Sequence, residues 1–110
     1  MTYETQALLL DLGISYWLTG FQTVGEAIDI ARTNLCRPDR DAKNYYDILS
    51  EKYSVDRHRI SNDIQRTVGI AWREHRTAME NVLGETFERP PSPRKFVYAA
   101  AGYLNEHEGR

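Results

Sequence analysis

Polar side chains that can read DNA bases gather near the middle of the sequence, in the stretch RHRISNDIQRTVGIAWR (Arg57–Arg73). Arginine can donate two hydrogen bonds to guanine, and asparagine or glutamine can pair in a similar way with adenine. If Ile60 faces a core, a turn of about 100° per residue defines the side of the helix that faces away from it. The outward residues are predicted to be His58, Asn62, Gln65, Arg66, Gly69 and Arg73, with Arg59 and Ser61 at the edges. The stretch is therefore typical of a helix that reads DNA.

The same stretch has an apolar stripe that would hold the helix against a core. The stripe advances by three or four positions at a time, as one buried helical face should, and consists of Ile60, Ile64, Thr67, Val68 and Ala71. Asp56 is a plausible N-cap for this helix. A shorter helix is predicted before it, capped by Asp39 or Asp41 and ending at Tyr53, with its inward residues at Tyr45, Ile48, Leu49 and Tyr53. Two helices joined by a tight turn indicate a helix-turn-helix, whose second helix enters the major groove.

Cationic side chains around this motif are suited to contact DNA phosphates. The predicted phosphate-binding residues are Lys52, Arg57, His58, Arg73 and Arg76. Residues 52–76 contain six Lys or Arg and three Asp or Glu, which gives +3, so the remainder of this chain of net charge -2 carries -5. A basic face on an acidic body is compatible with phosphate contact, but it predicts weak non-specific binding because the body repels the duplex.

The remaining sequence is predicted to be helical almost throughout. A first helix over residues 4–12 would end at Gly13, and a compact apolar connector would follow over residues 14–20. Thr23 and Glu26 form a capping-box pattern at the start of the next helix. Later helices are expected over residues 78–83, ending at Gly84, and from Ser92-Pro93 to about residue 106. The inward residues of the last helix are predicted to be Phe96, Val97, Ala100 and Leu104. The fold class is therefore all-α, with about six helices around one core in a single domain over residues 1–110.

Other functional classes have little support in the sequence. The three histidines, at positions 58, 75 and 107, lack the spacing of a metal site, and no phosphate-binding glycine loop or nucleophile motif is present. We therefore expect no enzyme activity, cofactor or metal. No apolar run approaches the about 20 residues that cross a bilayer, and no secretory signal is visible. Together with the lone Cys36, this favours a cytoplasmic protein that makes no membrane contact.

Several short segments resemble a known family in their order and spacing. They are LLLDLGI (8–14), LTGF (18–21), GEAI (25–28), YYDILSEKYSV (45–55), RIS..I (59–64), IAW (70–72) and, in the last helix, SPRKFV (92–97). Together they are similar to the C-terminal effector domain of the sporulation master response regulator (stage zero sporulation protein A). The likeness covers nearly the whole chain. The receiver domain that precedes this effector domain in the family's regulators is not part of the sequence, so we expect regulation of another kind.

The resemblance implies a six-helix domain whose helix-turn-helix reads a short promoter box. It also implies tandem binding or a homodimer on double-stranded DNA, and contact with the sigma subunit of RNA polymerase. The base-reading positions of the family fall on Arg59, Ser61, Asn62, Gln65 and Arg66. Only Arg59 keeps the usual residue: Ser61 replaces an acid, and Asn62 and Gln65 replace arginines. These departures predict a different DNA box and weaker binding.

Two functions follow from these observations. The first is a sequence-specific DNA-binding transcription regulator of the sporulation type, with its recognition helix in the major groove. The alternative is a protein-interaction module that binds a related regulator or RNA polymerase without an operator of its own. The acidic net charge and the missing arginines favour the alternative, whereas the arginine and amide side chains of the predicted recognition helix favour DNA binding.

Overall fold

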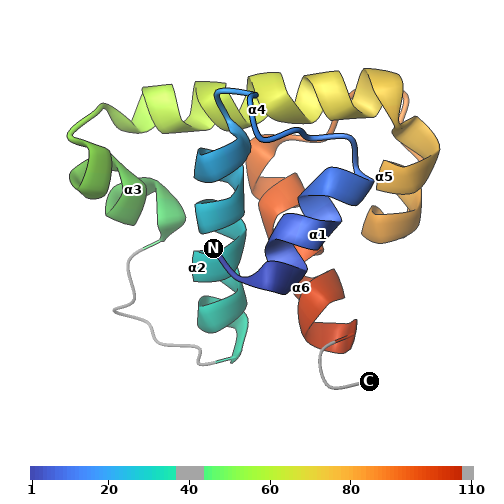
Figure 1. Cartoon of the computed structure of the whole chain (residues 1–110), viewed down its shortest axis with the longest axis horizontal. Helices are drawn as coiled ribbons and strands as arrows, with labels where there is room; N and C mark the ends of the chain where they lie inside the picture. The colour runs from blue at the N-terminus through green and yellow to red at the C-terminus, as the bar shows by residue number, and fades with distance from the viewer. Residues whose placement is uncertain (37–43, 108–110) are drawn as a thin grey trace.

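The computed structural model describes residues 1–36 and 44–107, and these residues contain six helices and no strand (Figure 1). The helices are α1 (Tyr3–Asp11), α2 (Phe21–Cys36), α3 (Tyr45–Tyr53), α4 (Arg57–Glu74), α5 (Arg76–Leu83) and α6 (Pro93–His107). The predicted all-α class is confirmed. None of these helices is long and apolar enough to cross a membrane.

Side chains and glycines predicted from the sequence set several of the helix boundaries. The Ser92 hydroxyl accepts a hydrogen bond from the Lys95 amide at 3.2 Å at the start of α6, where Pro93 is the first helical residue. Gly84 ends α5 with a φ of 76°, a left-handed conformation that glycine adopts without steric cost. Gly13, with a φ of 80°, follows α1 in the same way. The polar and glycine signals at these boundaries therefore match the structure within about two residues, the ordinary uncertainty of a helix end.

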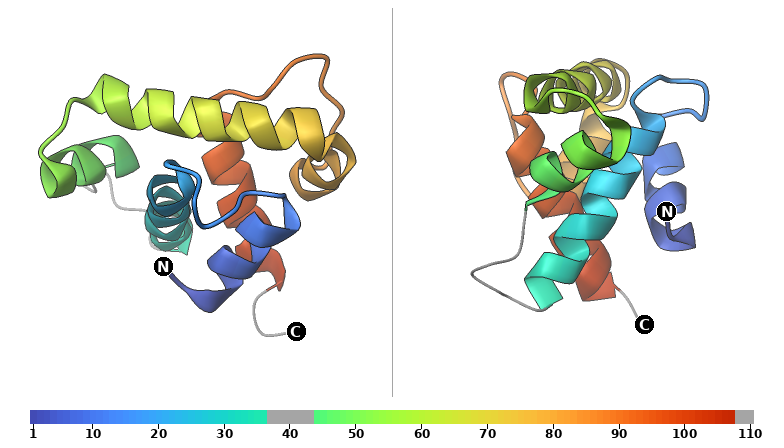
Figure 2. Two further views of the ribbon diagram at one scale, coloured as in Figure 1. Left: turned by 45° about the horizontal axis from the view of Figure 1, so that its top comes forward. Right: turned by 90° about the vertical axis from the view of Figure 1, so that its left-hand side faces the viewer.

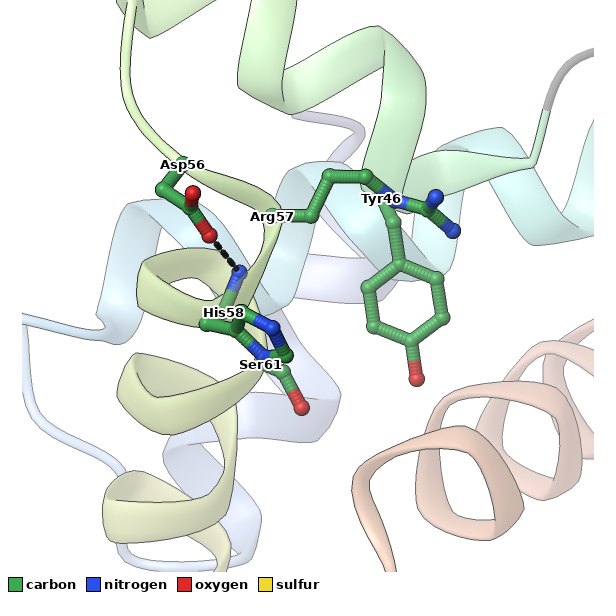
Figure 3. A pocket seen from close by; sticks show the side chains of 5 residues that line it. All are labelled: Tyr46, Asp56, Arg57, His58 and Ser61. Carbon is green, nitrogen blue, oxygen red and sulfur yellow. Dashed lines mark hydrogen bonds between the residues drawn. The ribbon is translucent and has the colours of Figure 1, made fainter.

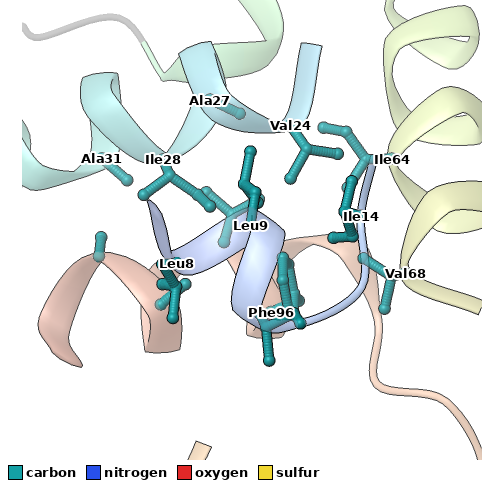
Figure 4. Packing of buried hydrophobic residues seen from close by; sticks show 14 of the residues in the cluster. Leu8, Leu9, Ile14, Val24, Ala27, Ile28, Ala31, Ile64, Val68 and Phe96 are labelled. Atoms are coloured by element: carbon teal, nitrogen blue, oxygen red, sulfur yellow. The ribbon is translucent and has the colours of Figure 1, made fainter. Parts of the chain in front are cut away.

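The core lies where α2 and α6 pack side by side, with α1 against them and α4 across their upper ends (Figures 1 and 2). Figure 4 shows apolar side chains from four helices and the first connector meeting there, including Leu9, Ile14, Val24 and Phe96, none of them exposed to solvent. Ile64 of α4 points into the same cluster and is also fully buried. The core therefore fixes the orientation of α4 about its own axis.

The capping box predicted at Thr23 and Glu26 is wrong. The helix begins at Phe21, two residues before Thr23, and Thr23 lies within it as a buried residue. Glu26 does not fold back onto the helix start but accepts hydrogen bonds from Gln22 and from α3. Phe21 begins α2 earlier because its ring is buried against the core and forms an edge-to-face contact with the Tyr16 ring. Tertiary packing therefore overrides the local capping signal.

The start of α3 also differs from the prediction. The proposed caps Asp39 and Asp41 lie outside the described residues. The helix begins at Tyr45, and the Asn44 side chain caps it by accepting a hydrogen bond from the Asp47 amide at 3.2 Å. Tyr45, predicted to face inward, is fully buried, but Tyr53 is 38% exposed. The last turn of α3 therefore projects beyond the core.

Candidate nucleic-acid interface

A three-residue turn joins α3 to α4, and hydrogen bonds within the motif fix its geometry. Ser54 adopts a left-handed conformation with a φ of 53°, and the Ser50 hydroxyl donates to the Val55 carbonyl at 2.5 Å. The Asp56 carboxylate then accepts a hydrogen bond from the His58 amide at 2.7 Å. Asp56 thus caps α4 as predicted and satisfies one of the free amides at the helix start. The turn and the cap together set where α4 begins relative to α3.

The two faces of α4 differ in the way that the sequence predicts. The apolar stripe, consisting of Ile60, Ile64, Thr67, Val68 and Ala71, is buried. Four of the five residues predicted to read bases are exposed, namely Arg59, Asn62, Gln65 and Arg66, and Ser61 is half-buried. In Figure 1, α4 forms the upper edge of the molecule. No other described part of the chain covers its outward face.

Three arginines on the outward face of α4 have no carboxylate partner among the residues that the structure describes. Arg59, Arg66 and Arg73 are exposed, and none forms an ion pair with another residue that the structure describes. Exposed guanidinium groups without an acidic partner are available to an anionic ligand, and they are well suited to bidentate contact with guanine or phosphate. We refer to Arg59, Arg66 and Arg73 as the unpaired arginines.

Residues 5–104 match a family described as the C-terminal domain of the sporulation initiation factor Spo0A. The chain belongs to this family. No curated protein and no solved structure gives a significant match. The Spo0A C-terminal family consists of DNA-binding effector domains that regulate transcription in sporulation, so a DNA-binding regulatory role is assigned to the chain at family level.

Other cations around the motif of this Spo0A C-terminal domain are already paired with acids. The Lys52 ammonium lies 2.6 Å from a carboxylate oxygen of Glu26 on α2. The Arg57 guanidinium lies 3.1 Å from the Asp47 carboxylate on α3. Arg76 is paired in a similar way with Glu80. We refer to Lys52, Arg57 and Arg76 as the paired cations. All three belong to the set predicted to contact phosphates. Their acidic partners were not predicted from the sequence.

Arg76 lies at the corner where α4 ends and α5 begins. Its guanidinium is 3.5 Å from the Glu80 carboxylate, it donates to the Phe87 carbonyl, and it lies 4.9 Å from the centre of the Trp72 ring. The four-residue spacing of this pair was visible in the sequence as a helical ion-pair signal. The Lys52 pair had no such signal because its partner is on another helix. Contacts within the domain therefore hold Arg76 in place.

A shallow depression of about 440 Å³ adjoins the first turn of α4 on the side of α3 (Figure 3). It is lined by Tyr46, Asp56, Arg57, His58 and Ser61. This lining explains why Ser61 is less exposed than the other predicted base-reading residues. The first turn also presents the positive end of the helix dipole, which attracts anions. The depression is therefore part of the candidate interface, and it places Ser61 at the border between the outward face and α3.

The connector between α1 and α2 contributes exposed aromatic residues that were not predicted. It runs beside α4 in both views of Figure 2. At Gly20 it touches α4 so closely that a side chain there would overlap the Thr67 hydroxyl. Trp17 on this connector is 84% exposed and Tyr16 is 57% exposed. The apolar composition of the connector suggested compact packing, and periodicity gives no signal in so short a segment. The structure therefore leaves the largest side chain of the connector in solvent.

Proposed function

We propose that the chain binds double-stranded DNA in a sequence-specific manner, with α4 in the major groove, and thereby regulates transcription. In this proposal Arg59, Asn62, Gln65 and Arg66 contact base edges, with Ser61 at the border of the contact. Arg73 and His58 approach the phosphates, together with Lys52, Arg57 and Arg76 where these can leave their acidic partners. Such a role implies a cytoplasmic location.

The observation that supports this proposal best is the outward face of α4. A polar face rich in arginine and amide groups lies opposite a buried stripe, and no other described segment covers it. A helix held by the core on one side and open on the other can enter a groove as a rigid body. Family membership supports the same reading.

Selection of bound oligonucleotides from a random pool, at low and at moderate salt, tests this proposal directly. An enriched motif that the purified chain then binds more tightly than a scrambled sequence is the expected result. Binding that is equal for all sequences would contradict base reading by α4. A complete absence of binding would contradict the whole proposal.

We extend the proposal to tandem binding on DNA and to contact with the sigma subunit of RNA polymerase, which the resemblance of the sequence segments to this family implies. Sedimentation of the chain with the selected DNA would give the number of copies bound, and two copies per repeated site are expected. A pull-down with purified sigma subunit tests the second contact separately.

A second candidate function is a protein-interaction module that binds a related regulator or RNA polymerase without its own operator. It is favoured by the pairing of Lys52, Arg57 and Arg76 with acids and by the net charge of -2. Both reduce the attraction to a duplex. Capture of a related regulator by a chain that ignores selected and genomic DNA would favour this function over the first.

A further inference from the structure

The carboxylate of Glu26 is the centre of a hydrogen-bond cluster between α2 and α3. One oxygen accepts from the Lys52 ammonium at 2.6 Å and from the Gln22 amide at 2.9 Å, and the other accepts from the Tyr53 hydroxyl. The Glu26 side chain is only 12% exposed, whereas that of Lys52 is 55% exposed. A largely buried acid on α2 thus holds a solvent-facing cation of α3.

Lys52 lies in the last turn of α3, immediately before the turn that leads into α4. A lysine there is close in the chain to Arg57 and His58, which line the depression at the start of α4. A phosphate that approached the first turn of α4 would therefore come near the end of α3, where the Lys52 side chain is already engaged by Glu26.

The protonation states of the two groups keep this ion pair charged near neutral pH. Partial burial works to raise the pKa of Glu26, but hydrogen bonds from Lys52, Tyr53 and Gln22 outweigh it and leave the pKa below its ordinary value. The hydrogen bond to Glu26 is the main reason that the pKa of Lys52 is raised. An anionic ligand must therefore compete with a charged carboxylate for this ammonium group.

Binding of a free cation to a DNA phosphate releases condensed counterions. Each such contact makes the negative slope of log K against log salt steeper by about 0.9. A cation that must first leave a carboxylate gains less from the phosphate, because it exchanges one anionic partner for another. The three unpaired arginines can contact phosphates without this exchange. Each paired cation must first leave its carboxylate.

We propose that Glu26 is an affinity-determining residue of the DNA interface, which lowers DNA affinity by competing with a backbone phosphate for Lys52. This inference rests on the proposed function, because it concerns the strength of the same interaction. The ligand is a phosphodiester of double-stranded DNA, and Glu26 itself makes no contact with it. The competition limits the number of phosphates that the domain neutralises.

Glu26→Gln tests this inference, since the amide keeps the size of the side chain and most of its hydrogen bonds but loses the charge. Affinity for the selected oligonucleotide is measured by fluorescence anisotropy over a salt series. We expect tighter binding by E26Q and a salt slope that is steeper by about 0.9. Its advantage over the parent should then shrink about threefold between about 50 mM and about 200 mM salt.

Two control variants separate release of Lys52 from a general change in charge. Glu4→Gln makes the same chemical change at an exposed position in the first turn of α1, where the acid has no ion pair with another described residue, and should leave the salt slope unchanged. The double variant E26Q/K52A should lose the gain in affinity. A gain that survives removal of Lys52, or an equal gain in E4Q, would overturn the inference.

Circular dichroism and thermal unfolding check that each variant is folded. If E26Q fails to fold, Glu26→Asp serves in its place, because a carboxylate that is shorter by one methylene keeps its charge but withdraws from Lys52. We expect a smaller gain of the same sign. If the parent binds its selected DNA and neither substitution raises affinity, the inference fails and the proposed function stands. If no variant binds DNA, both fail.

Discussion

The two faces of α4 have opposite relations to the rest of the molecule. Ile60, Ile64 and Val68 on the inner face pack into the core, and each is at most 2% exposed. Arg59 and Arg66 on the outer face have no ion-pair partner among the described residues. Substitutions on the inner face should therefore change stability, and substitutions on the outer face should change only binding. One helix can thus keep its position while its specificity changes.

The largest expected effect comes from the inner face. Ile64→Ala removes three buried carbon atoms from the centre of the core and should lower the free energy of unfolding by about 2–5 kcal/mol. Urea denaturation followed by circular dichroism measures this change. Asn62→Ala on the outer face is the matched control, with an expected change within about 0.5 kcal/mol. Similar losses in the two variants would contradict the division of α4 into two faces.

The next effect comes from the outer face and should appear in binding alone. Arg59→Ala should weaken binding to the selected DNA by about 1–3 kcal/mol and relax the preference at one base pair, while the unfolding midpoint stays unchanged. Arg73→Ala is the comparison variant, expected to weaken binding to all sequences alike and to reduce the salt slope. Competition assays with single-base variants of the oligonucleotide distinguish the two. A uniform loss in R59A would remove Arg59 from base reading.

A smaller effect is expected at Asp56, where the two faces begin. Asp56→Ala removes the side chain that caps α4 and should cost about 1 kcal/mol of stability. Thermal unfolding near neutral pH measures this loss. Asp63→Ala, on the same helix but outside the cap, should have less effect. If the two substitutions proved equal, the cap would not be the source of the stabilisation.

The smallest effect should occur at the border between the faces. Ser61 is half-buried in the wall of the depression beside α3, and its hydroxyl forms no hydrogen bond with another described residue. Ser61→Ala should change stability by no more than about 0.5 kcal/mol and should change affinity less than Arg59→Ala does. Urea denaturation measures the change in stability, and fluorescence anisotropy with the selected DNA measures the change in affinity. A loss equal to that of R59A would move the centre of the interface towards α3.

The helix-turn-helix could be predicted from the sequence because its signals are local. The Asp56 cap and the apolar stripe of α4 are separated by only a few residues, and both agree with the structure. For the same reason, Gly84 predicted the end of α5, and Ser92 predicted the start of α6 after the loop. Boundaries set by capping and periodicity need no knowledge of the rest of the chain.

Features that depend on distant residues could not be predicted in this way. Glu26 was assigned to a capping box by its spacing from Thr23, but its actual partners lie 26 and 27 positions away on α3. Tyr53, which was predicted to face inward, belongs to the same contact, because its hydroxyl donates to Glu26. The pairing of Lys52 is therefore decided by how α2 meets α3, and a pattern within one helix cannot reveal it. The pair of Arg76 with Glu80, by contrast, lies within one helix.

The contact between Gly13 and His75 links two bends of the chain that are far apart in sequence. A side chain added at Gly13 would overlap the imidazole of His75, its closest ring carbon lying 2.0 Å from the added atom. His75 is the single residue between α4 and α5. A larger residue at position 13 would have to displace the His75 ring, and its φ of 80° would strain any residue other than glycine, so glycine is required where this bend meets the joint between α4 and α5.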